Sequence, residues 1–212
     1  MICCLKPRPP ANVTAPEDCG DGGVDAGDVA LSPTAQQQRP PPAEVSRVAL
    51  FAAVEEDDVL AVEALLGAGV GIDEVDPEDG YTALILAAEG GGACVAPLLE
   101  AGANVEARDA FGRSAAYAAA VAGQAGTVAA LLAAGANADA VDDDGRTALW
   151  AACALRHVAA AAALADRGAN VDAPDARGVS PRAHASVEGH AEVVAFLDER
   201  GAEKSAAARL TV

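Results

Sequence analysis

The chain has 212 residues, of which 52% are hydrophobic and only 3% aromatic, and its net charge is −18. This charge argues against nucleic acid and anionic membrane as partners, because phosphate binding needs clustered Lys and Arg; basic partners are favoured instead. Alanine supplies most of the apolar residues, which suits closely stacked helices. The start of the chain has no apolar signal region, and no apolar window approaches about 18 residues, so we expect neither secretion nor a transmembrane segment.

Residues 1–43 are rich in Pro, Gly and Ala without periodicity, and we interpret them as a disordered tail. Cys3 and Cys4 are either lipidated or two exposed thiols. Pro40–Pro42 is either a ligand for an SH3- or WW-like groove or a stiff linker. The five cysteines match neither a disulfide framework nor a zinc quartet, which favours a reducing compartment, so we expect a cytoplasmic or nuclear protein.

A period of 33 residues dominates the rest of the chain. It is seen in five glycines that are each 33 residues apart: Gly69, Gly102, Gly135, Gly168 and Gly201. A ladder of hydroxyl side chains runs beside them at intervals of 32, 33 and 33 residues: Thr82, Ser114, Thr147 and Ser180. Self-similarity at a fixed period of this length is typical of a stacked repeat protein.

One period predicts turn, helix, tight connection, helix and long loop. Gly135 is expected to end a helix in the left-handed conformation, and the Asp-rich segment 142–145 is expected to form a turn. Thr147 then follows as the N-cap of a new helix. The apolar face of that helix is predicted at positions i, i+3 and i+4, which are Leu149, Ala152 and Cys153.

This period resembles the ankyrin repeat, whose consensus begins Asp-x-x-Gly-x-Thr-Pro-Leu-His and ends Leu-Leu-x-x-Gly-Ala-Asp. The matching stretches include DGYTALILAAEGGG…LLEAGANVEA and DDDGRTALWAACALRH…LADRGANVDA. The resemblance implies an all-α solenoid of helix pairs with loop or β-turn fingers. Its domain would cover residues 44–203, followed by a C-terminal tail at 204–212, with units at about 45–76, 77–108, 109–141, 142–174 and 175–203.

Two units depart from the pattern. The unit 77–108 is one residue short, carries Gly90–Gly92 between its helices and has Pro97 in its second helix. A proline inside a helix costs about 3 kcal/mol, so we predict a kinked or shortened helix between residues 92 and 100. In the last unit, Arg182 and His184 replace apolar residues and are expected to face water as a C-terminal cap. Leu210–Val212 also fits a loose PDZ-ligand pattern.

The histidine of the family consensus is replaced by an apolar ladder: Phe51, Ile85, Tyr117 and Trp150. One interpretation is that these side chains pack between adjacent units. The other is that Tyr117 and Trp150 are partly exposed binding anchors, since aromatic residues are frequent hot spots. Both interpretations can hold together.

The sequence shows no constellation typical of catalysis. His157, His184 and His190 have positions that favour structural roles, and no serine or cysteine is paired with a base. An EF-hand loop with Gly145 at its sixth position needs acids at 140 and 151, where Ala stands. We therefore expect no catalytic, cofactor or metal site and no enzymatic activity.

The resemblance implies a monomeric, non-enzymatic scaffold or adaptor that binds a protein partner on the concave surface of the stack. A membrane-tethered adaptor acting through Cys3 and Cys4, or a targeting subunit of an enzyme complex, are the alternatives. Phe111 is the foremost candidate contact, being a bulky apolar residue on a loop tip. Arg113 and Arg146 either clamp a partner carboxylate or only balance Asp109 and the acids at 142–144. The candidate partner-binding residues are Tyr81, Glu89, Ala110, Phe111, Arg113, Val121, Asp143, Asp144, Arg146, Trp150, Leu155, Ala176, Arg177, Val179 and Glu188.

Overall fold

The structure, a computed structural model, describes residues 42–210, with side chains described for residues 46–201. Helices pair in chain order in this part of the chain: α1 (Pro42–Glu55) with α2 (Val59–Gly67), α3 (Ala83–Glu89) with α4 (Val95–Glu100), α5 (Ala115–Val121) with α6 (Ala125–Ala133), α7 (Ala148–Ala154) with α8 (Val158–Asp166), and α9 (Pro181–Val187) with α10 (Ala191–Leu210). The expected all-helical stack of paired helices is confirmed.

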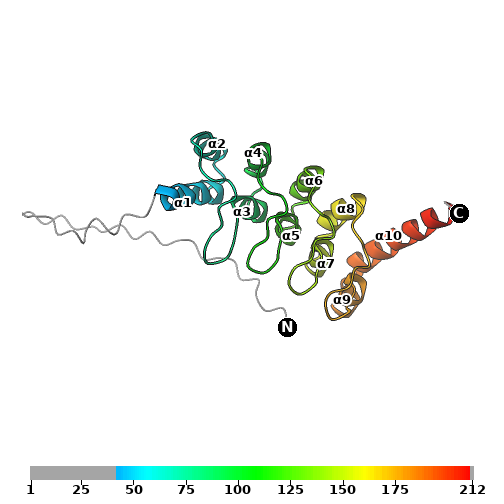
Figure 1. Cartoon of the computed structure of the whole chain (residues 1–212). Helices are drawn as coiled ribbons and strands as arrows, with labels where there is room; N and C mark the ends of the chain where they lie inside the picture. The colour runs from blue at the N-terminus through cyan, green and yellow to red at the C-terminus, as the bar shows by residue number, and fades with distance from the viewer. Residues whose placement is uncertain (1–41, 211–212) are drawn as a thin grey trace, which may run out of the picture. The chain divides into compact units, whose positions relative to one another are not determined.

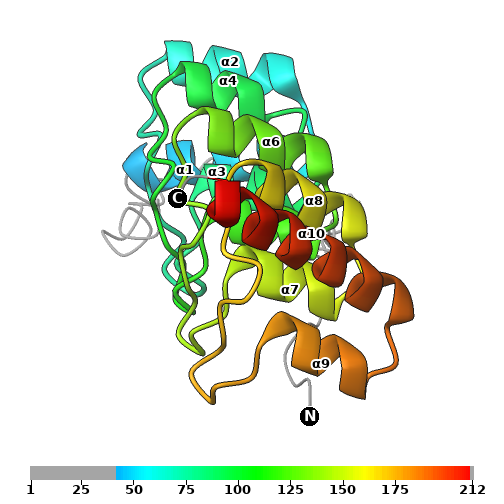
Figure 2. The same cartoon turned by 90° about the vertical axis from the view of Figure 1, so that its right-hand side faces the viewer.

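Successive pairs lie side by side in two rows. The first helices, from α1 to α9, form one row, and the second helices α2, α4, α6 and α8 form the other (Figure 1; Figure 2). Helix α3 packs on α5, α5 on α7, and α7 on α9, while α6 packs on α8. Long loops project from between the pairs, and three of them are closed by isolated β-bridges at Val75–Thr82, Arg108–Ser114 and Val141–Thr147. We call the loops before α3, α5, α7 and α9 the fingers.

The predicted hydroxyl ladder is confirmed as a row of N-caps. Each hydroxyl accepts a hydrogen bond from the backbone N–H three residues later, at 3.3 Å for Thr82, 3.3 Å for Ser114, 3.1 Å for Thr147 and 3.2 Å for Ser180. A cap of this kind contributes about 1 kcal/mol. The first helices therefore begin where the period of the sequence places them.

The glycine ladder behaves as predicted at four of its five positions. Gly69, Gly102, Gly135 and Gly168 have φ between +85° and +98° just after a second helix. Gly201 instead lies inside α10, which continues to Leu210. The C-terminal tail expected at 204–212 is thus helical as far as residue 210.

The core is built largely from alanine, as the composition suggests. Buried alanines of the first helices, such as Ala119 and Ala152, allow adjacent helices to approach closely, and buried leucines such as Leu131 and Leu149 fill the space between the two rows. The described helices include none that is long and apolar enough to cross a membrane.

Helix α4 is shortened, as predicted, but for a different reason. It has six residues, against nine in each of α2, α6 and α8. It begins only at Val95, so Pro97 occupies its first turn, where the backbone N–H would have no partner within the helix. The expected penalty of about 3 kcal/mol for a proline inside a helix is therefore wrong here.

Some expectations concern residues at the ends of the chain. Cys3, Cys4, Pro40 and Pro41 lie outside the described residues, as do the last two residues of the PDZ-like pattern. Pro42 is the first residue of α1 and so does not continue an extended polyproline segment. This agrees with the tolerance of helices for proline at their first position.

Candidate functional site

Each finger is organised by one aspartate at its base. The Oδ1 atom of Asp109 accepts hydrogen bonds from the backbone N–H groups of Phe111 at 2.9 Å and Arg113 at 2.8 Å. Asp142 and Asp175 do the same in the next two fingers. The sequence predicts this role for the turn at 142–145, where Asp side chains are expected to bond to their own backbone, and Asp142 confirms it. For Asp109, only charge balance with Arg113 is expected from the sequence. The recurrence of such an aspartate once per repeat is the signal that could have revealed this structural role.

The Asp175 carboxylate shows how firmly such a group is held. Burial acts to raise its pKa, but the backbone N–H groups of Val179 and Arg177 and the Arg177 charge outweigh burial and hold the pKa below its ordinary value. The ionised form of Asp175 is therefore the one that the finger stabilises.

Neighbouring fingers are joined by their backbones. Ala110 donates to the Asp79 carbonyl at 3.0 Å, Asp143 to the Phe111 carbonyl at 3.1 Å, and Ala176 to the Asp144 carbonyl at 2.9 Å. Carboxylates in the first part of the fingers add a second set of links, which was not predicted from the sequence: Asp73, Glu106 and Asp139 each accept from the backbone N–H of an Asn 31 residues later. The finger tips therefore form a preorganised row.

Arg113 lies at the centre of a contact cluster between the first two fingers. Its Nε is 2.6 Å from Asp109 Oδ2, and its Nη2 donates to the Tyr81 hydroxyl at 2.9 Å. Its guanidinium carbon lies 4.8 Å from the centre of the Phe111 ring and 5.7 Å from that of Tyr81. Burial raises the pKa of Tyr81, with Arg113 opposing the shift and Glu89 adding to it. Phe111 nevertheless remains 53% exposed.

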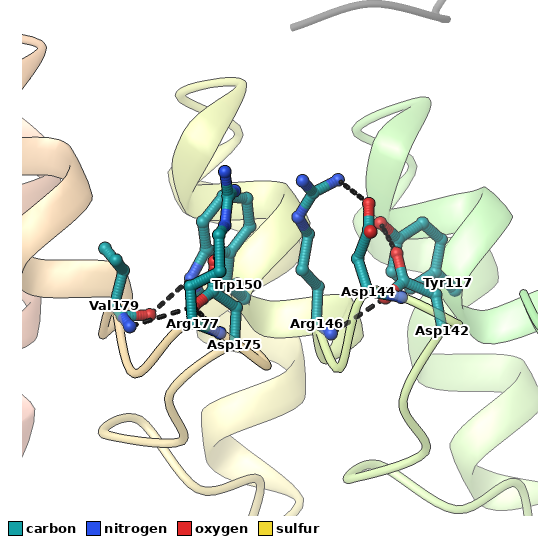
Figure 3. A network of polar contacts seen from close by, with 8 residues as sticks. All are labelled: Tyr117, Asp142, Asp144, Arg146, Trp150, Asp175, Arg177 and Val179. Carbon is teal, nitrogen blue, oxygen red and sulfur yellow. Dashed lines mark hydrogen bonds and ion pairs between the residues drawn. The ribbon is translucent and has the colours of Figure 1, made fainter. Parts of the chain in front are cut away.

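Arg146 has a similar arrangement one repeat later. Its Nη1 is 3.0 Å from Asp144 Oδ2, and its guanidinium carbon lies 5.0 Å from the Trp150 ring (Figure 3). Each arginine is thus paired with a carboxylate of its own finger. Of the two interpretations of Arg113 and Arg146, these contacts favour charge balance over a clamp on a partner.

Tyr117 and Trp150 are only 6% and 5% exposed, so the interpretation that they are partly exposed anchors is wrong, and the interpretation that they pack between units is right. Trp150 Nε1 donates to the Val179 carbonyl at 3.0 Å, and the Tyr117 hydroxyl donates to Asp142 Oδ2 at 2.8 Å (Figure 3). Burial, followed by Asp142, raises the pKa of Tyr117 well above its ordinary value.

The C-terminal unit is only partly as expected. Arg182 is exposed and pairs with Asp198 on α10. His184 was expected to face water, but it is half-buried, with its ring 4.7 Å from that of Trp150. The histidine is therefore part of the packing between the last two units.

The remaining candidates fall into two groups. Asp143 and Arg177 are exposed on the fingers, and Arg177 pairs with Asp175 at 3.3 Å. The others lie at the far ends of the first helices, where Glu89 and Glu188 are exposed and Val121 and Leu155 half-buried. A seven-residue helix is about 10 Å long, so these ends are separated from the finger tips. The finger-tip residues Ala110 and Ala176 are exposed and act through their backbones.

The two cysteine thiols of the described residues are buried. Burial raises the pKa of the Cys94 thiol to about 11, with Asp57 adding to it, and burial raises that of Cys153 to about 12, so both are protonated at neutral pH. Among the described residues, no group of three or more His, Cys, Asp or Glu side chains is placed to hold a metal ion.

The family comparison agrees with this geometry. The model of ankyrin repeats (three copies) matches residues 50–142 and 117–208. A search of curated proteins finds no match. Repeats of this kind are typically non-catalytic modules that bind other proteins. Together with the paired helices and their fingers, the match over residues 50–208 shows that the chain belongs to the ankyrin repeat family.

Proposed function

We propose that this protein is a non-enzymatic scaffold or adaptor that binds a protein partner along the fingers and the adjoining first helices. The observation that carries this proposal is Phe111, which is 53% exposed at a finger tip. Because its finger is held by Asp109 and by backbone links to both neighbours, the fold does not need an apolar side chain there. Exposed aromatic residues on rigid supports are frequent hot spots of protein interfaces.

Preorganisation supports the same conclusion. The finger tips are joined by backbone hydrogen bonds between Asp79 and Ala110, Phe111 and Asp143, and Asp144 and Ala176. A surface that is already ordered loses little conformational entropy when a partner binds, so more of the contact energy remains as affinity.

Charge favours a partner with basic segments. Three finger arginines are each paired with an aspartate: Arg113 with Asp109, Arg146 with Asp144, and Arg177 with Asp175. The fourth, Arg108, donates to the backbone carbonyls of Gly112 and Val141. Other finger acids, such as Asp143 and Glu78, are exposed, and the net charge of the chain is −18. A basic partner would therefore be attracted over distances comparable with the Debye length, and salt would weaken the attraction.

Site-specific photocrosslinking tests the proposal. The photoreactive residue p-benzoylphenylalanine is placed at Phe111 or, as a matched control, at Leu60, which is 77% exposed on a second helix. Both full-length proteins are irradiated in extract of the cells that express the chain. We expect a discrete crosslinked protein from position 111 and not from position 60. Its yield is expected to fall when salt rises from about 0.05 to 0.5 M. The same products from both positions, or a product from Leu60 alone, would contradict the proposal.

A further inference from the structure

The four finger tips are chemically unequal. We define the tip of each finger as the second residue after its basal aspartate, which is Asp76, Asp109, Asp142 or Asp175. The tips are then Glu78, Phe111, Asp144 and Arg177. The only aromatic side chain among these four therefore lies between two acidic tips. Of these two acidic tips, Glu78 is exposed, and Asp144 is paired with Arg146 at 3.0 Å.

We propose that the Phe111 tip is a subsite for an arginine side chain of the protein partner, with the guanidinium stacked on the exposed part of the ring and paired with Asp143. This inference rests on the proposed function, since it names the chemistry of the partner at the same surface.

Asp143 is well placed to be the acidic half of this subsite. Its backbone N–H donates to the Phe111 carbonyl at 3.1 Å, so the two residues are held together. A Cβ atom at Gly112, next to Phe111, would lie only 2.6 Å from Asp143 Oδ1, which places this carboxylate directly against the Phe111 finger. Asp143 is exposed and enters no ion pair in the described part of the chain.

The arginine that already touches the ring does not fill the subsite. Arg113 lies 4.8 Å from the ring centre, and its charge is compensated by Asp109 at 2.6 Å. Phe111 is still 53% exposed beyond this contact. A second guanidinium on the exposed part would therefore meet a ring whose present arginine is already charge-compensated, with the Asp143 carboxylate against the neighbouring residue Gly112.

An arginine of the partner fits this subsite better than a lysine or an apolar residue would. A guanidinium is planar, stacks on an aromatic face and can bind a carboxylate with two parallel hydrogen bonds, whereas an ammonium is a compact and strongly hydrated point charge. An apolar partner residue would cover Phe111 but remove water from Asp143 without replacing its hydrogen bonds, which is costly.

A peptide library provides the test. Nine-residue acetylated and amidated peptides with a fixed central Arg and randomised flanks are compared with libraries in which the centre is Lys or citrulline. Citrulline keeps the planar shape of arginine and removes its charge. The full-length protein is compared with F111A, F111L and D143N, and with the matched control V187A, at a position that is 85% exposed on α9. Circular dichroism establishes that each variant remains folded.

We expect the Arg library to bind about tenfold more tightly than the citrulline library. F111A, F111L and D143N should each abolish most of this preference, whereas V187A should leave it unchanged. If Arg and citrulline peptides bind equally well and F111A weakens both, the arginine subsite is overturned. The finger surface would then still be a binding site. Binding that is insensitive to F111A, or no binding by any library, would overturn the subsite as well. In these last two cases, photocrosslinking at position 111 decides separately whether the proposed function also fails.

Discussion

Arg156 has a strained backbone, and relieving that strain should stabilise the protein. It connects α7 to α8 with φ of +65°, in the left-handed region where a Cβ atom is unfavourable. The residues one repeat before and after it, Gly123 and Gly189, have φ of +73° and no Cβ. The repeat architecture thus requires this conformation, and Arg156 adopts it at a cost.

The expected gain follows from two opposing effects. Replacing Arg156 by Gly removes a left-handed strain of about 1–2 kcal/mol. The added freedom of glycine in the unfolded chain costs about 0.4–1 kcal/mol. Arg156→Gly should therefore raise the free energy of unfolding by roughly 0–1.6 kcal/mol, and by about 0.8 kcal/mol at the middle of both ranges. Arg156→Ala, which keeps the Cβ atom, should change it little.

The reverse substitutions sharpen the test. Gly189→Ala should destabilise the protein by a similar amount, because no atom lies within 4 Å of the new Cβ and only the backbone strain is added. Gly123→Ala should cost more, since its Cβ would lie 2.7 Å from His157 Nδ1. Urea unfolding followed by circular dichroism measures each change as a shift of the midpoint at constant slope. A gain from Arg156→Ala as large as that from Arg156→Gly would refute the assignment to backbone strain.

Three further predictions concern buried groups. Tyr117→Phe removes the hydroxyl that donates to Asp142, so it should lower the free energy of unfolding by about 1 kcal/mol in urea titrations. Because the pKa of Asp175 is lowered by folding, its ionised form contributes stability above the unfolded pKa near 4. That contribution should be lost as pH falls through the lower folded-state pKa, and the loss should be smaller in Asp175→Asn when unfolding is measured between about pH 5 and 2. Cys94 and Cys153, whose thiols are buried, should resist alkylation by iodoacetamide until urea unfolds the chain. Mass spectrometry would show this in a variant whose three earlier cysteines are replaced by Ser.

The parts of the fold that the sequence predicts well are those set by local chemistry. Thr147 caps α7 because its hydroxyl lies three residues from a free backbone N–H, and this relation is the same at Thr82, Ser114 and Ser180. Gly135 ends α6 for an equally local reason, a positive φ of +98°. Such signals recur once in each repeat and do not depend on what lies elsewhere in the chain.

Helix α4 shows that the effect of a proline can be predicted only when the first residue of its helix is known. The neighbouring second helices α2 and α6 have their N-caps at Asp58 and Gln124. Residue 91 lies 33 residues from each of them and is the expected N-cap of α4, but the observed N-cap is Cys94. The glycines at 90–92 favour this delay because glycine is a poor helix former. The delay of three residues matches the shortening from nine to six and moves Pro97 into the first turn, where it is tolerated. The glycine run and the proline are therefore compatible with each other.

The candidate site also contains residues that local sequence predicts and residues that it does not. Trp150 could not be classified from its own repeat, because the groups that bury it, the Val179 carbonyl and the His184 ring, belong to the next one. The exposure of Phe111 could be predicted because its position in a turn of the finger, held by Asp109, leaves its side chain outside the helix stack. In a stack whose units contact only their neighbours, the side chains of the next unit determine whether a residue that faces it is buried. A finger tip, by contrast, stays open to solvent. An apolar tip is therefore informative about binding in a way that an apolar residue inside the stack is not.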